Sequence, residues 1–368
     1  MAKDTRRFGR RPFQPTDFQE WMTDVRKQVD SHLAEFLASR RSFLAELGVS
    51  DAGHALESFV LDGGKRTRPA FCHLGWLGAA GADEDALYAV AAALELFHAF
   101  ALQHDDLIDN SATRRGRPAQ HRRLAALHAD AGWLGSADEF GAATAMLLGD
   151  LSLVWADELF ESAGLPPDRL VAARRLYHRM RSEAVAGELL EVRYRAEHRR
   201  SVQRSLLTAL FKGARYTIEQ PLRLGGVVAG ADASLLDFYS DFGVPLGVAF
   251  QLRDDLLGAF GSPQRTGKPV TDDFREGKPT VLFACAWEAA DSQQRKRLTS
   301  LYGRPGLDDG DAREIRNLMR ATGAVRRVEE LIDHRVKRAL WLVESAPVPE
   351  EIRPAFTHLA LAAVHRDH

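Results

Sequence analysis

The sequence predicts an all-α protein, and three observations support this prediction. Apolar residues recur at intervals of three and four along most of the 368 residues, which is the spacing of one face of an α-helix. Clusters of Gly, Pro, Asp and Ser separate these stretches. The sequence has no convincing run of alternating apolar and polar residues, the pattern typical of β-strands.

The helical stretches follow one another along the whole chain. The long predicted helices cover residues 18–47, 86–109, 140–164, 168–195 and 234–260, and others lead to a last one over 350–366. Breaks are predicted at residues 62–69, 80–85, 129–138, 164–169, 229–234, 261–280 and 302–314. Residues 88–102 are apolar almost all round, which predicts a helix that is surrounded by protein.

The length would allow two domains, but no linker and no shift in composition divides the chain. We therefore expect one helical domain over residues 15–368. Residues 1–14 are rich in Arg and have no apolar run behind the arginines. This composition predicts a basic, disordered tail and no signal peptide.

Composition excludes several classes of protein. The net charge of −2 argues against a nucleic-acid binder, which needs a basic excess to displace counterions. The two cysteines, Cys72 and Cys285, are too few for a disulfide framework, so we expect buried thiols in a reducing compartment. No stretch approaches the roughly 20 uninterrupted apolar residues of a membrane span. We expect a cytoplasmic protein without a transmembrane segment.

The predicted helix over residues 86–109 ends in a block of acids, "HDDLID". Asp105 and Asp109 are four residues apart, and Asp106 and Asp109 are three apart, so helical geometry places them on one side. Like charges repel, and the helix dipole disfavours anions at a C-terminus. Taken alone the block is also compatible with a solvated helix end. A divalent cation such as Mg²⁺, which takes carboxylates together with substrate phosphates, would stabilise it.

A second acidic helix end repeats this arrangement. "RDDLLG" carries Asp254 and Asp255, with Gly258 in the place of a third acid. Two such ends can face each other across a cavity and hold metal ions on a polyphosphate. Basic residues lie near both ends in the sequence, although each lysine alone could be a surface charge: Lys65, Arg66, Arg68, Arg114, Arg115, Lys212, Lys268 and Lys278. The combination indicates a site for two highly anionic groups.

Four segments together resemble the trans-isoprenyl diphosphate synthases, also called polyprenyl synthetases. They are "GGKRTRP" (63–69), "ELFHAFALQHDDLIDNSATRRGRP" (95–118), "AFQLRDDLLGAFG" (249–261) and "TGKPVTDDFREGKPT" (266–280). The resemblance implies the all-α isoprenoid synthase fold in a single domain, a homodimer, and three Mg²⁺ ions per active site. It implies head-to-tail condensation of isopentenyl diphosphate with an allylic diphosphate.

The resemblance also implies a role for each motif position. Metal ions would be held by Asp105, Asp106, Asp109, Asp254 and Asp255. The allylic diphosphate would contact Arg114, Lys212, Gln251, Lys268 and Lys278. The isopentenyl diphosphate would contact Lys65, Arg68, His98 and Arg115, although His98 alone would be read as a core histidine. Ionisation of the allylic substrate would depend on Asp105, Asp109, Asp254, Lys212 and Lys268.

The same resemblance places the floor of a product tunnel at Phe97, Phe100 and Ala101. Phe100 precedes Asp105 by five residues, or about 7.5 Å along a helix axis. An aromatic residue there predicts a twenty-carbon geranylgeranyl product, with fifteen-carbon farnesyl or another length as the alternative. A class I terpene cyclase and a non-catalytic prenyl synthase subunit are further alternatives. The sequence departs from the family pattern at Gly258, Gly213 and Glu188.

Overall fold

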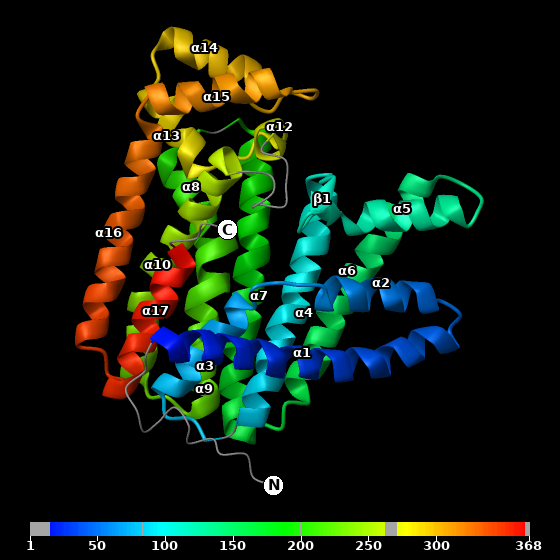
Figure 1. Cartoon of the computed structure of the whole chain (residues 1–368), viewed down its shortest axis with the longest axis vertical. Coiled ribbons are helices and arrows are strands. Elements are labelled where there is room, and N and C mark those ends of the chain that lie inside the picture. The colour runs from blue at the N-terminus through cyan, green and yellow to red at the C-terminus, as the bar shows by residue number, and fades with distance from the viewer. Residues whose placement is uncertain (1–14, 83, 199, 262–270, 365–368) are drawn as a thin grey trace.

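The computed structural model describes residues 15–82, 84–198, 200–261 and 271–364 (Figure 1). Helices make up most of this part of the chain, and the one pair of strands found there is two residues long, which confirms the all-α prediction. The predicted tail over residues 1–14 and the predicted site residue Lys268 lie outside the described residues.

The first half of the chain forms seven helices and one short hairpin within the described residues. Their bounds are α1 Pro15–Glu46, α2 Ser50–Leu61, α3 Thr67–Gly78, α4 Glu84–Ile108, β1 Thr113–Arg114, β2 Arg117–Pro118, α5 Gln120–Asp130, α6 Ala137–Glu161 and α7 Pro167–Ala196. Four of the five long predicted helices correspond to α1, α4, α6 and α7, and the fifth to α10 Ala233–Phe260 in the second half, with ends that shift by a few residues.

The second half of the chain consists mostly of shorter helices, together with two long ones. Their bounds are α8 Val202–Thr208, the π-helix η1 Ala209–Glu219, α9 Gln220–Ala229, α10 Ala233–Phe260, α12 Asp272–Glu276, α13 Val281–Ala289, α14 Ser292–Leu301, α15 Asp309–Ala321, α16 Ala324–Glu344, the 3₁₀-helix η2 Glu350–Ile352 and α17 Arg353–Val364. The π-helix η1 was not predicted. Such segments are rare and often mark functional sites.

The helix α4 lies in the core, as its apolar sequence predicted. It runs along the long axis of the molecule and packs against α6, while α1 crosses it (Figure 1). In the described part of the chain it is also the one helix long and apolar enough to cross a membrane. However, 67% of its most apolar stretch is buried inside the protein, and its last turn carries the acidic motif. We conclude that α4 is a core helix, so its length and composition do not indicate a transmembrane segment.

Close helix contacts position the elements of the site, and glycine permits them. A Cβ on Gly187 of α7 would lie 2.3 Å from the backbone nitrogen of Lys212 in η1. A Cβ on Gly247 of α10 would lie 2.6 Å from the carbonyl oxygen of Ala214, also in η1. Real Cβ atoms do not approach this closely. The π-helix is therefore held between α7 and α10 at backbone contact, which fixes where Lys212 points.

Both cysteines are buried and unpaired, as predicted. Cys72 lies in α3 and Cys285 in α13, each with no exposed surface. Burial raises the pKa of the Cys285 thiol to about 11, so the thiol stays protonated and inert.

Candidate active site

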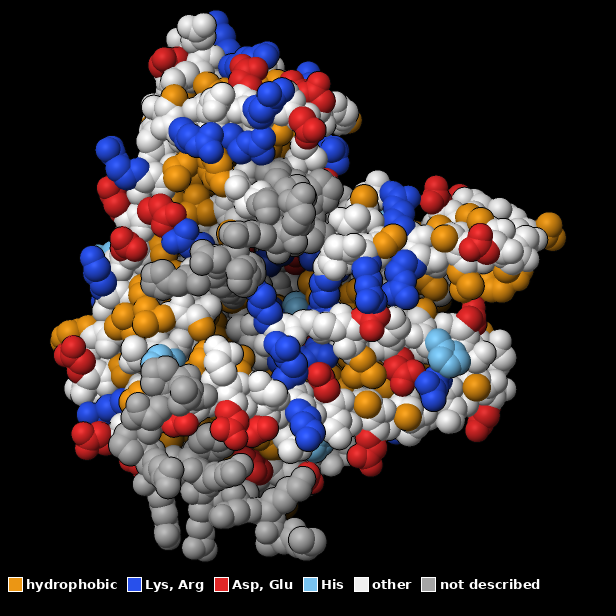
Figure 2. All heavy atoms as spheres, viewed as in Figure 1, with side chains coloured by type: hydrophobic (Ala, Val, Ile, Leu, Met, Phe, Trp, Pro, Cys, Tyr) orange, Lys and Arg blue, Asp and Glu red, His pale blue; other side chains and the backbone are white. Residues whose placement is uncertain are grey.

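A cavity of about 1530 Å³ opens between α3, α4, α7, η1 and α10. Figure 2 shows a hollow near the middle of one face, with Lys and Arg side chains beside it. The predicted site residues that line the cavity are Lys65, Arg68, Phe97, His98, Phe100, Ala101, Asp105, Arg114, Arg115, Lys212, Gln251, Asp254, Asp255 and Lys278. Segments that are far apart in the sequence therefore meet at one site.

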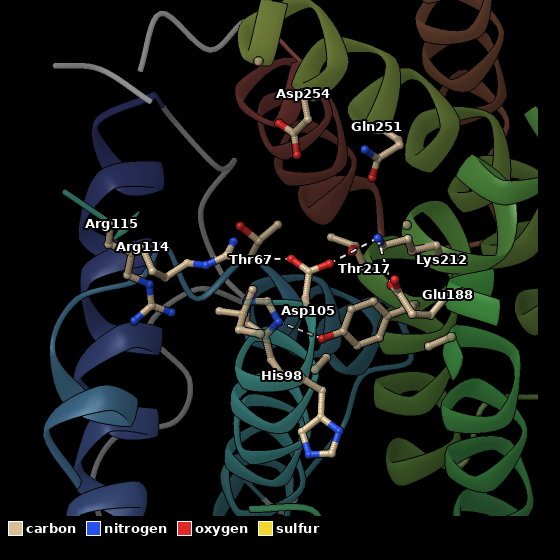
Figure 3. Close-up of a pocket in the computed structure, with 18 of the residues that line it drawn as sticks. Thr67, His98, Asp105, Arg114, Arg115, Glu188, Lys212, Thr217, Gln251 and Asp254 are labelled. Atoms are coloured by element: carbon tan, nitrogen blue, oxygen red, sulfur yellow. Dashed lines mark hydrogen bonds and ion pairs between the residues drawn. The ribbon is translucent and has the colours of Figure 1, made fainter. Parts of the chain in front are cut away.

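Asp105 is the acid of the first motif that faces the cavity. Its carboxylate lies between two cations: Arg114 Nη2 is 2.8 Å from one oxygen and Lys212 Nζ is 3.2 Å from the other (Figure 3). These contacts balance the charge that the helix dipole disfavours at this end of α4.

The structure does not bring Asp106 and Asp109 to the cavity wall, which differs from the expectation for metal ligands. Successive residues on a helix point about 100° apart, so Asp106 turns inward where Asp105 faces the cavity. Asp106 is buried and accepts a hydrogen bond of 2.9 Å from Arg114 Nε, and its Oδ2 has no hydrogen-bond partner among the described residues. Asp109 follows the last turn of α4 and lies between Arg195 Nη1 and Lys278 Nζ, at 2.9 and 2.8 Å. Although burial opposes ionisation, the pair with Lys278 lowers the pKa of Asp109.

The hairpin β1–β2 separates the two arginines that follow the acids. Arg115 and Gly116 are its central residues, and both have a positive φ, 53° and 73°. This is the type I′ conformation that two-residue hairpins favour. The turn sends the side chains of Arg114 and Arg115 in different directions (Figure 3). Arg115 donates to the carbonyl oxygen of Asp62 at 3.2 Å, beside the loop that carries Lys65.

The second acidic end lies across the cavity. Asp254 and Gln251 extend from α10 toward Asp105 (Figure 3). Gln251 Nε2 donates to Asp255 Oδ1 at 3.1 Å. Burial, with the nearby charges of Asp273 and Asp254, raises the pKa of Asp255 to about 8. A cation is the natural partner for such a group of acids.

The departure at Gly213 has a steric explanation. A Cβ on Gly213 would lie 2.3 Å from Gln251 Oε1. The amide of Gln251 thus occupies the space into which a larger residue at position 213 would extend.

A second polar cluster lies on the α3 side, formed by Arg68, His98, Tyr216 and Thr217. Arg68 Nη2 donates to Thr217 Oγ1 at 3.0 Å, and its guanidinium lies 4.0 Å from the centre of the Tyr216 ring. His98 Nδ1 is 2.7 Å from the Tyr216 hydroxyl (Figure 3). Burial and the neighbouring arginines, Arg68 first, hold the pKa of His98 well below its usual range. His98 is therefore a neutral hydrogen-bonding group.

Arg66 belongs to the fold and not to this cluster. Its buried guanidinium pairs with Asp30 at 2.7 Å and Glu95 at 2.8 Å. All three basic residues of this segment border the cavity, but the guanidinium of Arg66 is buried and held by these two acids, whereas that of Arg68 contacts Thr217.

Lys212 is surrounded by carboxylates. Besides Asp105, its Nζ lies 2.8 Å from both Glu188 and Glu191 of α7. These contacts outweigh burial and raise the pKa of Lys212, so the ammonium remains charged. Glu188, the third departure from the family pattern, is therefore a direct partner of Lys212.

Several residues at this site were missed by sequence reasoning, namely Glu191, Arg195, Tyr216, Thr217 and Asp273. Glu188, Glu191 and Arg195 are spaced by three and four, so one face of α7 carries them all. This spacing could have predicted that the three charged side chains lie together on one face of a helix. The position of Tyr216 depends on the π-helix, which no local pattern in the sequence indicates.

An aromatic group lines the apolar part of the cavity. The ring of Phe97 lies 5.4 Å from Phe100 and 5.5 Å from Tyr216, measured between centroids. Phe100 in turn packs on His104 at 4.6 Å. His104 Nε2 is 3.3 Å from the carbonyl oxygen of Met146, which ties this group to α6. Phe97, Phe100 and Ala101, the residues predicted to form a tunnel floor, all line the cavity.

The donor set fits Mg²⁺ that arrives with a diphosphate. Among the described residues, no three His, Cys, Asp or Glu side chains are grouped closely enough to hold a metal by themselves. Asp105, Asp254 and Asp255 nevertheless line the cavity with oxygen donors. Mg²⁺ commonly uses one or two carboxylates and completes its shell with water and substrate phosphates.

Comparison with known proteins gives a consistent result. The family model described as polyprenyl synthetase matches residues 51–319. A solved geranylgeranyl pyrophosphate synthase from Corynebacterium glutamicum, complexed with isoprenyl diphosphate and magnesium, superposes with a TM-score of 0.90 at 37% identity over 93% of this chain and 98% of that one. A geranylgeranyl diphosphate synthase of Sulfolobus acidocaldarius is 31% identical over 66% of this chain and 68% of its own length. Heptaprenyl diphosphate synthase component 2 of Geobacillus stearothermophilus is 29% identical over 93% of this chain and 99% of its own length.

Proposed function

Because this chain belongs to the polyprenyl synthetase family, we propose that it condenses isopentenyl diphosphate with an allylic diphosphate, head to tail. One observation carries the proposal: acids from two helix ends on facing walls, a separate basic cluster beside them, and aromatic side chains all line a single cavity. This arrangement suits two diphosphates and one growing hydrocarbon chain.

In the proposed reaction the allylic C–O bond breaks, and diphosphate leaves with the bonding electrons. Bound Mg²⁺, which we propose is present as three ions, would supply neutralising charge to that diphosphate. Arg114, Lys212 and Lys278 would add the cations of the chain itself. At about 4 Å and an effective dielectric near 20, each unit charge pair contributes about 4 kcal/mol, so these groups can account for much of the barrier lowering.

The second substrate would be held by the opposite cluster. Lys65, Arg68 and Arg115 bind the isopentenyl diphosphate, and neutral His98 accepts or donates one hydrogen bond without adding charge. This holds the double bond beside the allylic carbon, where it forms the new C–C bond. The released diphosphate then takes the proton that restores the double bond.

We propose geranylgeranyl diphosphate as the product. Phe97, Phe100 and His104 pack on one another and line the cavity, and two of the relatives described above are named for the same product. Farnesyl diphosphate or another length is the alternative.

We also propose a homodimer in the cytoplasm. Apolar side chains stand exposed along neighbouring turns of α6 and α7, namely Met146, Leu147, Val154, Val185, Leu189 and Val192. A second copy of the chain would cover this face. The likeness to heptaprenyl diphosphate synthase component 2 favours the alternative of a subunit that needs a different partner. The unpaired cysteines suit a reducing compartment.

The direct test is to incubate the purified protein with Mg²⁺, isopentenyl diphosphate and each of the five-, ten- and fifteen-carbon allylic primers, and then to size the products. We expect twenty-carbon geranylgeranyl diphosphate. Another length would keep the reaction and reject the proposed floor. Hydrocarbon formed from an allylic diphosphate alone would indicate a cyclase, and no turnover with any primer would indicate a non-catalytic subunit.

A further inference from the structure

The histidine that precedes the first acidic motif packs on the residue proposed as the tunnel floor. His104 lies four residues after Phe100 on α4, so helical geometry places the two side chains on the same face, one turn apart. Their ring centroids are 4.6 Å apart, and both side chains line the cavity. The position of the Phe100 ring therefore depends on where the imidazole is held.

Hydrogen-bond acceptors on α6 hold the imidazole of His104. Its Nε2 lies 3.3 Å from the carbonyl oxygen of Met146 and 3.4 Å from Asp150 Oδ1. Because a carbonyl and a carboxylate oxygen only accept hydrogen bonds, Nε2 carries a hydrogen and donates toward α6. The ring of His104 is thus anchored to a helix other than its own.

A recess in α6 at Gly149 receives the edge of the imidazole. A Cβ on Gly149 would lie 2.4 Å from His104 Cδ2 and 2.5 Å from its Nε2, closer than real Cβ atoms approach. Gly149 is buried and is not among the residues that line the cavity. Any influence of Gly149 on the cavity would therefore pass through His104.

The other ring neighbour of Phe100 is anchored as well. Phe97 is 1% exposed, and its ring lies 5.4 Å from Phe100 and 5.5 Å from Tyr216. Phe100 itself is only partly buried. Held between Phe97 and His104, its ring has fixed neighbours on two sides, and removing His104 would leave room for another rotamer.

We propose that His104 is a positioning residue for product length. Anchored to α6, its imidazole keeps the Phe100 ring across the path of the growing chain. The proposal rests on the prenyl transfer and the tunnel floor proposed above. It adds α6, through Met146, Gly149 and Asp150, to the elements that determine where the tunnel ends.

The test is product length, sized by chromatography after incubation with Mg²⁺, isopentenyl diphosphate and the fifteen-carbon allylic primer. In His104→Ala the ratio of longer products to the twenty-carbon product should rise about 3- to 10-fold, the scale set by the loss of one aromatic pair. His54→Ala is the matched control and should leave the ratio unchanged. His54 is an exposed histidine on α2 whose Nδ1 lies 2.8 Å from a backbone carbonyl oxygen.

Further variants separate this role from a general disturbance of the helix end beside Asp105. His104→Phe keeps a ring against Phe100 and should restore most of the twenty-carbon product, whereas His104→Gln keeps a donor without a ring and should not. Because His104 acts through Phe100, adding His104→Ala to Phe100→Ala should lengthen the product no further.

The recess is tested from the α6 side. Gly149→Ala displaces the imidazole without changing a residue that lines the cavity. It should alter the product ratio where residue 104 is histidine and have no effect in the His104→Ala background. The same effect in both backgrounds, or no effect in the folded single variant, would contradict the anchoring of His104 by α6.

Each remaining outcome decides the question. An unchanged ratio in folded His104→Ala, at whatever rate, overturns the inference and leaves the proposed function standing. Longer products in the double variant than in Phe100→Ala alone also overturn it. If His104→Ala does not fold, equal ratios in His104→Phe and His104→Gln overturn the inference, and a longer product in His104→Gln supports it. If the unmodified protein forms no prenyl product with any primer, the proposed function fails first, and this inference fails with it.

Discussion

Two arginines in one short basic segment have different roles, so the residue type alone does not predict what each side chain does. Arg66 and Arg68 are two positions apart, yet Arg66 pairs with Asp30 and Glu95 in the core and Arg68 contacts Thr217 on the cavity wall. Arg66 has a left-handed backbone, with a φ of 49° immediately before α3, and this turns its side chain away from that of Arg68.

This difference predicts opposite effects of matched substitutions. Arg66→Met leaves Glu95 as an uncompensated buried charge, so the free energy of unfolding should fall by about 3–5 kcal/mol. Arg68→Met should leave the melting temperature nearly unchanged and raise KM for isopentenyl diphosphate about 10-fold or more. Urea denaturation and steady-state kinetics on both variants check this. Equal loss of stability in the two would contradict the division of roles.

Lys212 is one of the two cations that contact Asp105 at the first acidic end. It contacts Asp105, Glu188 and Glu191 at 3.2, 2.8 and 2.8 Å. Lys212→Met removes a preorganised charge from the leaving group, and kcat should fall by about 10²–10³-fold. Lys296→Met, an exposed change on α14, is the control and should keep full activity. A loss below threefold in Lys212→Met would exclude Lys212 from the ionisation step.

At the scale of the helices, α7 positions η1 and its residue Lys212 through a close backbone contact that only a small residue allows. Gly187→Ala would drive a methyl group into η1, because the added Cβ would lie 2.3 Å from the backbone nitrogen of Lys212. We expect overpacking to cost about 1–3 kcal/mol of stability and to lower kcat by displacing η1. Gly310→Ala on α15, where the nearest atom is a side-chain oxygen at 3.1 Å, is the control. If Gly187→Ala keeps its melting temperature and kcat, the contact between α7 and η1 does not set the site.

The proposed tunnel floor, Phe100, lies about one and a half helical turns before Asp105 on α4. Phe100→Ala removes the ring that packs on Phe97 and His104, so products longer than twenty carbons should accumulate. Phe43→Ala, at a half-exposed position on α1, should leave the product distribution unchanged. Chromatographic sizing of the dephosphorylated products checks both. An unchanged product in Phe100→Ala would mean that the floor lies elsewhere.

At the scale of the whole molecule, the sequence predicts the helices and the cavity better than it predicts individual contacts. The period of three and four residues identifies α1, α4, α6, α7 and α10, because their apolar faces are long. The acidic motifs predict which helix ends meet. The inward turn of Asp106, the π-helix and the close approach of the Asp273 carboxylate to Gly258 were not predicted, because each depends on how distant elements pack and not on local pattern.

The central claim is that one cavity holds two diphosphates at separate places, one through metal ions and one through side chains alone. Calorimetric titration tests it most directly. Isopentenyl diphosphate should bind in the presence of EDTA, because Lys65, Arg68 and Arg115 need no metal. An unreactive thiolo analogue of the allylic diphosphate should bind only with Mg²⁺, and neither ligand should displace the other. Competition between the two for one place, or isopentenyl binding that requires Mg²⁺, would contradict the account.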